Sequence, residues 1–95
     1  MEFAWDPAKA AANLKKHGVS FHKAATVFFD PLSTTFPDDA HSTTEQRFLT
    51  IGRSIEGDTL VVAHREQEDS IRIISARPAT RRERGFYEQG ESARG

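Results

Sequence analysis

The chain has 95 residues, of which 37% are hydrophobic and 28% charged, and these values predict one small globular domain. It has no cysteine, which excludes disulfides and thiolate zinc sites, and no run approaches the roughly 18 apolar residues of a membrane span. The formal net charge is −1, but all four lysines lie within residues 9–23 and all nine arginines at residue 47 or beyond, so local charge patches matter more than the average.

Two helices are predicted in the first third of the chain. Asp6 followed by Pro7 is typical of an N-cap with proline in the first turn, and strong helix formers then continue to a glycine. We therefore expect a helix over residues 7–17. Ser20 is expected to cap a second helix over residues 21–29. The start of the chain lacks the apolar stretch of a secretory signal, so a cytoplasmic protein is expected.

Strands are predicted from the middle of the chain onward. Residues 32–37 are rich in β-branched and aromatic types, although Pro37 keeps this strand short or at an edge. Three stronger strands begin at residues 47, 59 and 70. They are separated by connections of hairpin length, which predicts an antiparallel meander.

Alternation along the strands predicts which side chains share a face. In the strand from residue 70, one face holds Ile71, Ile73 and Ser75, and the other holds Arg72, Ile74 and Ala76. In the strand from residue 59, one face holds Val61, Ala63 and Arg65, and the other holds Leu60, Val62 and His64. Alternation alone leaves open which face is exposed.

A third helix is predicted after the last strand. Thr80 and Glu83 form a T-x-x-E capping box, so this helix begins near residue 81. Residues 89–95 have no apolar periodicity and are expected to be a flexible tail, which leaves residues 1–88 as the single domain. The predicted class is α+β, with two N-terminal helices, an antiparallel meander of three to four strands and a C-terminal helix.

Five of the thirteen cationic side chains fall within residues 72–88. Arg72 and Arg77 belong to the last strand and its end, and three more arginines open the final helix, whose N-terminus already favours anions. Guanidinium groups bind phosphate bidentately, and the aromatic pair Phe86 and Tyr87 could stack on an unpaired base. A surface on which these arginines only pair with neighbouring carboxylates stays open as the alternative.

The four histidines lack the spacing of a metal site, so neither a metal nor another cofactor is expected. His17, His41 and His64 are candidates for proton transfer, with a structural role open for each. There is no Walker A, G-x-G-x-x-G or G-x-S-x-G motif, so nucleotide hydrolysis and serine-hydrolase chemistry have no support. Metal-free cleavage of RNA fits this composition, because RNA supplies its own nucleophile in the 2′-hydroxyl.

Four blocks within residues 3–88 resemble, in the same order, the BrnT toxin family. They are FAWDPAKAAANLKKHGVSF, VFFDP, HSTTEQRFLTIGRS and IRIISARPATRRERGFYE. The resemblance implies the toxin of a type II toxin–antitoxin system, with a RelE-like fold, that cleaves RNA without a metal and arrests bacterial growth. It also implies a BrnA-like antitoxin with a ribbon-helix-helix part, through which alone the complex binds its operator DNA.

Carried onto this sequence, the resemblance implies two sets of site residues. The catalytic candidates are Arg65, Arg72, Arg77, Tyr87 and His17. The RNA-binding candidates are Lys16, Arg81, Arg82 and Arg84. Which of them act as general acid and base stays open. A non-catalytic subunit that binds RNA or protein in an autorepressor complex is the alternative function, and both a homodimer and a heterotetramer with the antitoxin are compatible with the sequence.

Overall fold

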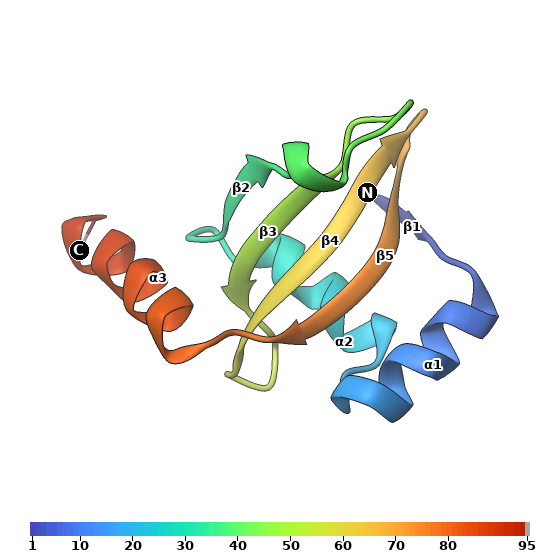
Figure 1. Cartoon of the computed structure of the whole chain (residues 1–95). Coiled ribbons are helices and arrows are strands. Elements are labelled where there is room, and N and C mark those ends of the chain that lie inside the picture. The colour runs from blue at the N-terminus through green and yellow to red at the C-terminus, as the bar shows by residue number, and fades with distance from the viewer. Residues whose placement is uncertain (95) are drawn as a thin grey trace.

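The computed structural model describes residues 1–94, with side chains described as far as Gly90. Its strands form one sheet in the order β1-β5-β4-β3-β2 (Figure 1). They are β1 (Glu2–Ala4), β2 (Thr34–Pro37), β3 (Phe48–Arg53), β4 (Thr59–Gln67) and β5 (Ser70–Pro78). The helices are α1 (Pro7–His17), α2 (Phe21–Thr26) and α3 (Arg81–Arg94), with short 3-10 turns at Val27–Phe29 and Asp39–His41.

The predicted α+β class and antiparallel meander are confirmed, since β2, β3, β4 and β5 pair in sequence with antiparallel neighbours. The first strand was not predicted. It pairs parallel to β5, with Glu2 beside Ser70 and Ala4 beside Arg72. Three residues are too few to show an alternating pattern, so β1 becomes a strand only because the edge of β5 offers it backbone partners.

The N-terminal helix has the predicted bounds because both of its ends are capped. The Asp6 carboxylate accepts a hydrogen bond from the Ala8 N–H at 2.9 Å. At the other end Gly18 adopts φ 72°, a left-handed conformation that glycine reaches without steric cost.

The second helix starts as predicted, because the Ser20 hydroxyl accepts a hydrogen bond from the Lys23 N–H at 3.1 Å. It ends earlier than predicted, at Thr26, and Val27–Phe29 continues as a 3-10 turn. The Thr26 hydroxyl donates to the Lys23 carbonyl at 2.6 Å and so competes with the regular backbone ladder at this point.

The main core lies between the sheet and the two N-terminal helices, which Figure 1 shows together on one side of the sheet. Its buried side chains come from the chain around α2 and from the central strands: Val19, Phe21, Ala24, Val27, Leu60, Val62, Ile73 and Ala76. All are apolar, so this layer is held by exclusion of water.

Asn13 is the buried polar side chain that fixes α1 to the sheet. Its amide nitrogen donates to the carbonyls of Val19 at 2.9 Å and Ala76 at 2.8 Å. Its amide oxygen accepts from the Ala76 N–H at 3.1 Å. The side chain therefore pairs with the edge of β5 beyond the point where β1 stops.

A β-bulge at Ile74 overturns the alternation predicted along β5. Ala63 lies opposite Ser75, but the next residue on β4, His64, lies opposite Ile73, so Ile74 has no partner on β4. One extra residue shifts the side-chain pattern by one position. Ile73, predicted to share a face with Ser75, is instead buried in the main core.

The helix α3 covers one end of the opposite sheet face. Tyr87 and Ala79 pack on Ile51 and Val61 to form a second, smaller core. The predicted capping box is confirmed, because the Glu83 carboxylate accepts from the N–H of Thr80 at 2.8 Å and the Thr80 hydroxyl accepts from that of Glu83 at 3.2 Å.

This last helix is longer than predicted and extends to Arg94, over most of the stretch expected to be a tail. The backbone of residues 89–94 continues the helix because it contains no proline and includes several helix-forming types. The absence of apolar periodicity in a segment indicates that no helix face is available to pack against a core. It does not indicate that the backbone is non-helical. Residue 95, the end of the predicted tail, lies outside the described residues. Within residues 1–94, no helix is both long and apolar enough to cross a membrane.

Replacement of Asn13 by alanine should lower the free energy of unfolding by about 2–4 kcal/mol, because two buried carbonyls and one N–H lose their partner. Urea denaturation followed by circular dichroism measures the change. Lys15→Ala, an exposed change in the same helix, is the matched control and should cost less than about 0.5 kcal/mol. Equal stability of the two variants would contradict the role given to Asn13.

Candidate functional site

Three arginines stand side by side on the sheet face that α1 and α2 leave uncovered. Arg72 on β5 lies directly opposite Arg65 on β4. Arg47 directly precedes Phe48, which begins β3 and lies opposite His64, so Arg47 continues the same row across the next strand. We call these three residues the arginine row. Like charges opposite one another destabilise a sheet, so the row carries an electrostatic cost that folding alone does not explain.

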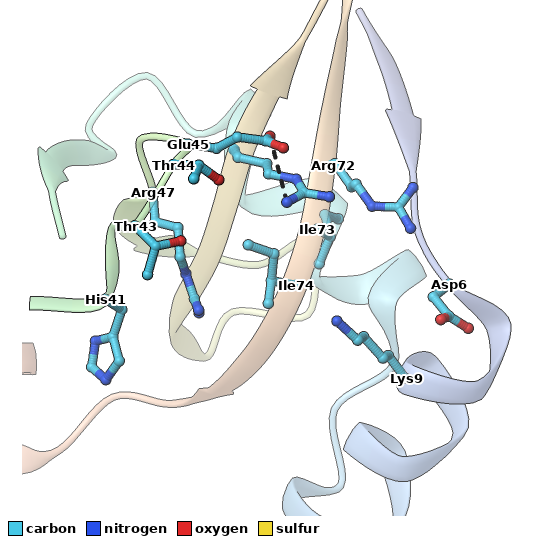
Figure 2. Close-up of a pocket in the computed structure, with 11 residues that line it drawn as sticks. Asp6, Lys9, His41, Thr43, Thr44, Glu45, Arg47, Arg72, Ile73 and Ile74 are labelled. Atoms are coloured by element: carbon cyan, nitrogen blue, oxygen red, sulfur yellow. Dashed lines mark ion pairs between the residues drawn. The ribbon is translucent and has the colours of Figure 1, made fainter. Parts of the chain in front are cut away.

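The arginine row lines a pocket of about 260 Å³ (Figure 2). Lys9 reaches it from α1 and adds a fourth cation. The bulge residue Ile74 places an apolar side chain among these cations, and Figure 2 shows the ends of Lys9 and Arg47 on either side of it. The other lining residues are Asp6, His41, Thr43, Thr44, Glu45 and Ile73.

Few carboxylates balance this charge. Glu45 approaches Arg65 with 3.4 Å between Oε2 and Nη1, and the carboxylate of Asp6 already caps α1. The Nε atoms of Arg47 and Arg65 are buried, and neither has a hydrogen-bond partner within the described part of the chain. Buried charged donors that lack acceptors indicate a site prepared for an anionic ligand such as phosphate.

Of the catalytic candidates, the structure brings Arg65 and Arg72 together but places Arg77 elsewhere. The guanidinium of Arg77 forms a bidentate ion pair with Glu83, at 2.7 and 2.9 Å. The hydrogen bond from Arg77 is the largest cause that lowers the pKa of Glu83 to about 2. Arg77 therefore fixes the start of α3 to the end of β5 and does not line the pocket of the arginine row.

Tyr87 is also occupied by a structural contact. It is 4% exposed, its hydroxyl donates to the Asp30 carboxylate at 2.5 Å, and the guanidinium of Arg53 lies 5.5 Å from its ring centroid. Burial raises the pKa of Asp30, but hydrogen bonds from the Arg53 N–H, from Tyr87 and from the Leu32 N–H outweigh it, and the pKa falls below its ordinary value. Tyr87 therefore holds α3 against the sheet face opposite α1 and α2.

The remaining candidates do not line the pocket of the arginine row. Lys16 and His17 lie at the C-terminal end of α1, about 10 Å along the helix axis from Lys9. Arg84 donates to the carbonyl of Ala79 at 3.2 Å. The last two arginines of the predicted RNA-binding set, Arg81 and Arg82, are exposed on the first turn of α3.

Sequence reasoning missed three groups in this pocket: Lys9, Glu45 and Arg47. Lys9 lies within the helix predicted over residues 7–17, and Glu45 lies between two predicted strands, so neither position by itself indicates a pocket. Arg47 stands at the start of a predicted strand, where its position relative to Arg65 depends on the register of the β3–β4 hairpin. A pattern in one strand contains no information about that register, although the family-like block HSTTEQRF holds two of the three groups.

The structure separates the histidine candidates. His64 is 4% exposed, has its Nε2 2.7 Å from the Thr50 hydroxyl and packs against the rings of Phe28 and Phe48. Burial lowers the pKa of His64 to about 4, so the ring is neutral at physiological pH and belongs to the core. His41 instead lines the pocket, with its Nδ1 3.1 Å from the carboxylate of Asp38.

The described residues contain no group of three or more His, Cys, Asp or Glu side chains that could hold a metal ion.

Fold and site together define a class: a small α+β domain that presents three arginines on an uncovered sheet face. The family follows from the sequence. Residues 5–83 match the family described as the ribonuclease toxin BrnT of type II toxin–antitoxin systems, and the chain belongs to this family. It is therefore a ribonuclease toxin, and membership implies an RNA target and an antitoxin partner.

The fold is similar to that of the Brucella abortus ribonuclease toxin BrnT, known from a crystal structure at 1.1 Å resolution. The TM-score is 0.66 at 23% sequence identity, and the match covers 85% of this chain and 99% of the other. Among curated protein sequences, none matches this chain significantly. The likeness to RelE implied by the family resemblance stays a prediction.

The stability of the protein should fall as the pH is lowered from about 6.5 to about 4, in part because of His64. In this range the unfolded chain binds a proton at His64 and the native chain does not, so protonation favours unfolding by up to about 3 kcal/mol. Urea denaturation at a series of pH values, compared with His64→Gln, isolates this contribution. Identical pH dependence in the two proteins would contradict a neutral buried ring.

The two arginine environments predict opposite effects on stability. Arg77→Ala should lower the free energy of unfolding by about 1–2 kcal/mol, because a bidentate pair that is partly exposed is lost. Arg72→Ala removes a cation that faces another cation, so the free energy of unfolding should stay the same or rise by about 0.5 kcal/mol. Thermal or urea denaturation of both variants measures this, and a large loss for Arg72→Ala would contradict the cost assigned to the arginine row.

Proposed function

We propose that this toxin is a metal-independent endoribonuclease that cuts RNA by attack of a 2′-hydroxyl group on the adjacent phosphodiester. The observation that carries the proposal is the arginine row, which supplies fixed positive charge where phosphate would bind. Charge builds up on the phosphate oxygens during this reaction, and guanidinium groups held in place beforehand stabilise it without reorganisation. The substrate brings the nucleophile, so the protein needs only to position the chain and move protons.

The spacing of the row suits one phosphodiester and its neighbours. Adjacent strands lie about 4.8 Å apart, so the cations at this end of the sheet project into one small volume. Lys9 adds an ammonium group from the other wall of the pocket. The apolar side chain of Ile74 offers a surface against which a base or ribose can pack while the phosphate remains among the cations.

For the antitoxin, we propose a BrnA-like protein whose ribbon-helix-helix part alone contacts operator DNA. Its inhibitory part would cover the arginine row, because an acidic segment and an RNA backbone compete for the same cations. The toxin would act in the cytoplasm, where its RNA target is found, and it would assemble as a homodimer or as a heterotetramer with the antitoxin.

Purified protein incubated with labelled RNA and EDTA should yield fragments that end in a 2′,3′-cyclic phosphate and begin with a 5′-hydroxyl. An oligonucleotide with a single 2′-deoxy position should resist cleavage at that position, because the nucleophile is missing there. Arg72→Ala should cut at least about 100-fold more slowly. Lys15→Ala, which removes an exposed cation outside the pocket, is the control and should keep its activity.

Three results would contradict the proposal. They are loss of cleavage in EDTA with recovery on addition of a divalent cation, cleavage at the deoxy position, and full activity of Arg72→Ala.

A further inference from the structure

Within the described residues, one proton acceptor of the pocket is ion-paired with a cation of the arginine row itself. Three groups that line the pocket could accept a proton: Asp6, His41 and Glu45. Asp6 is bound to the N–H of Ala8 as a helix cap. His41 contacts Asp38 through Nδ1, which leaves its Nε2 able to accept a proton and makes His41 the competing candidate. Within the described residues, Glu45 has its single polar contact with Arg65, a member of the row itself.

The loop before β3 holds Glu45 at this place. The Ser42 hydroxyl accepts hydrogen bonds from the Arg47 N–H at 2.9 Å and from the Gln46 side-chain amide at 3.0 Å. The same amide donates to the Arg47 carbonyl at 2.9 Å, and the Asp38 N–H donates to that carbonyl at 2.8 Å. These bonds close the loop at its base, so the backbone on either side of Glu45 is fixed relative to the sheet.

The contact between Glu45 and Arg65 is suited to exchange. It is a single ion pair at 3.4 Å, and the side chain of Glu45 is 59% exposed. Pairs of this kind contribute little free energy, so a phosphate group can replace the carboxylate on Arg65. The displaced carboxylate would then lie beside the bound phosphodiester.

We propose that Glu45 is the general base of the cleavage reaction, an inference that rests on the proposed function. Its carboxylate takes the proton of the 2′-hydroxyl as the bond between the 2′-oxygen and phosphorus forms. The bond between phosphorus and the 5′-oxygen breaks, and the departing oxygen takes a proton from water. The hydroxide that remains receives the proton held by Glu45, which restores both the carboxylate and the water.

This role predicts an effect opposite in sign to that of a simple counter-charge. If Glu45 only neutralised Arg65, its removal would free a cation and would strengthen both RNA binding and cleavage. If it is the base, Glu45→Gln keeps the shape of the side chain and loses the proton acceptor. Removal of a general base typically costs a factor of 10²–10⁴ in rate.

The experiment is single-turnover cleavage of a labelled RNA oligonucleotide in EDTA, with binding measured separately on the 2′-deoxy form. Glu45→Gln should lower the maximal rate at least about 100-fold, while the dissociation constant for the deoxy oligonucleotide stays within about threefold or becomes smaller. Glu66→Gln is the matched control, since it changes an exposed carboxylate next to Arg65 that does not line the pocket. It should cleave at the wild-type rate.

A second variant separates chemistry from structure. Glu45→Ala should be equally slow, and added formate should restore part of its rate, because a small carboxylate can enter the space left by the side chain. Undiminished or faster cleavage by Glu45→Gln would overturn the assignment, and so would the absence of any formate effect on Glu45→Ala.

The two proposals fail in different ways. Slow cleavage by Arg72→Ala beside normal cleavage by Glu45→Gln would leave the proposed function standing and refute the role of Glu45 alone. A wild-type protein that leaves RNA intact would contradict both.

Discussion

The pairing of β4 with β5, with its bulge at Ile74, is the constraint on which the rest of the site depends. It turns Ile73 into the core and sets Arg72 opposite Arg65 on the uncovered face. Without the extra residue, Arg72 would share a face with Ala76 and point under the helices. A single bulge therefore decides both that the core is apolar and that the cations meet in one pocket.

The arginines on this sheet face lie in two different environments. Arg77 and its partner Glu83 join the last strand to α3, and together with the contact between Tyr87 and Asp30 they fix that helix over the apolar end of the sheet. At the other end of the same face the cations of the arginine row lie opposite one another, and few carboxylates balance their charge. One end of the face thus stabilises the fold, and the other carries an electrostatic cost.

Local chemistry explains how much of the fold could be predicted. The caps at Asp6, Ser20 and Thr80 act within a few residues of their own helix, so the starts of all three helices were predicted correctly. The hairpins were predicted because their connections are short. The strand β1 and the bulge were missed, since β1 exists only through contact with β5 and the bulge only through the pairing of β5 with β4. Of nine candidate site residues, Arg65 and Arg72 reach the pocket of the arginine row.

The sequence by itself determined the α+β class, the meander, the helix starts, and membership of the BrnT toxin family through several blocks in order. Only the tertiary structure decided which charges meet. It brought Lys9, Glu45 and Arg47 into one pocket with the two strand arginines, and it placed Arg77 and Tyr87 outside that pocket, in contact with Glu83 and Asp30. The physical reason is that caps and turns depend on neighbours along the chain, whereas a binding pocket depends on strand register, which hydrogen bonds between distant segments set.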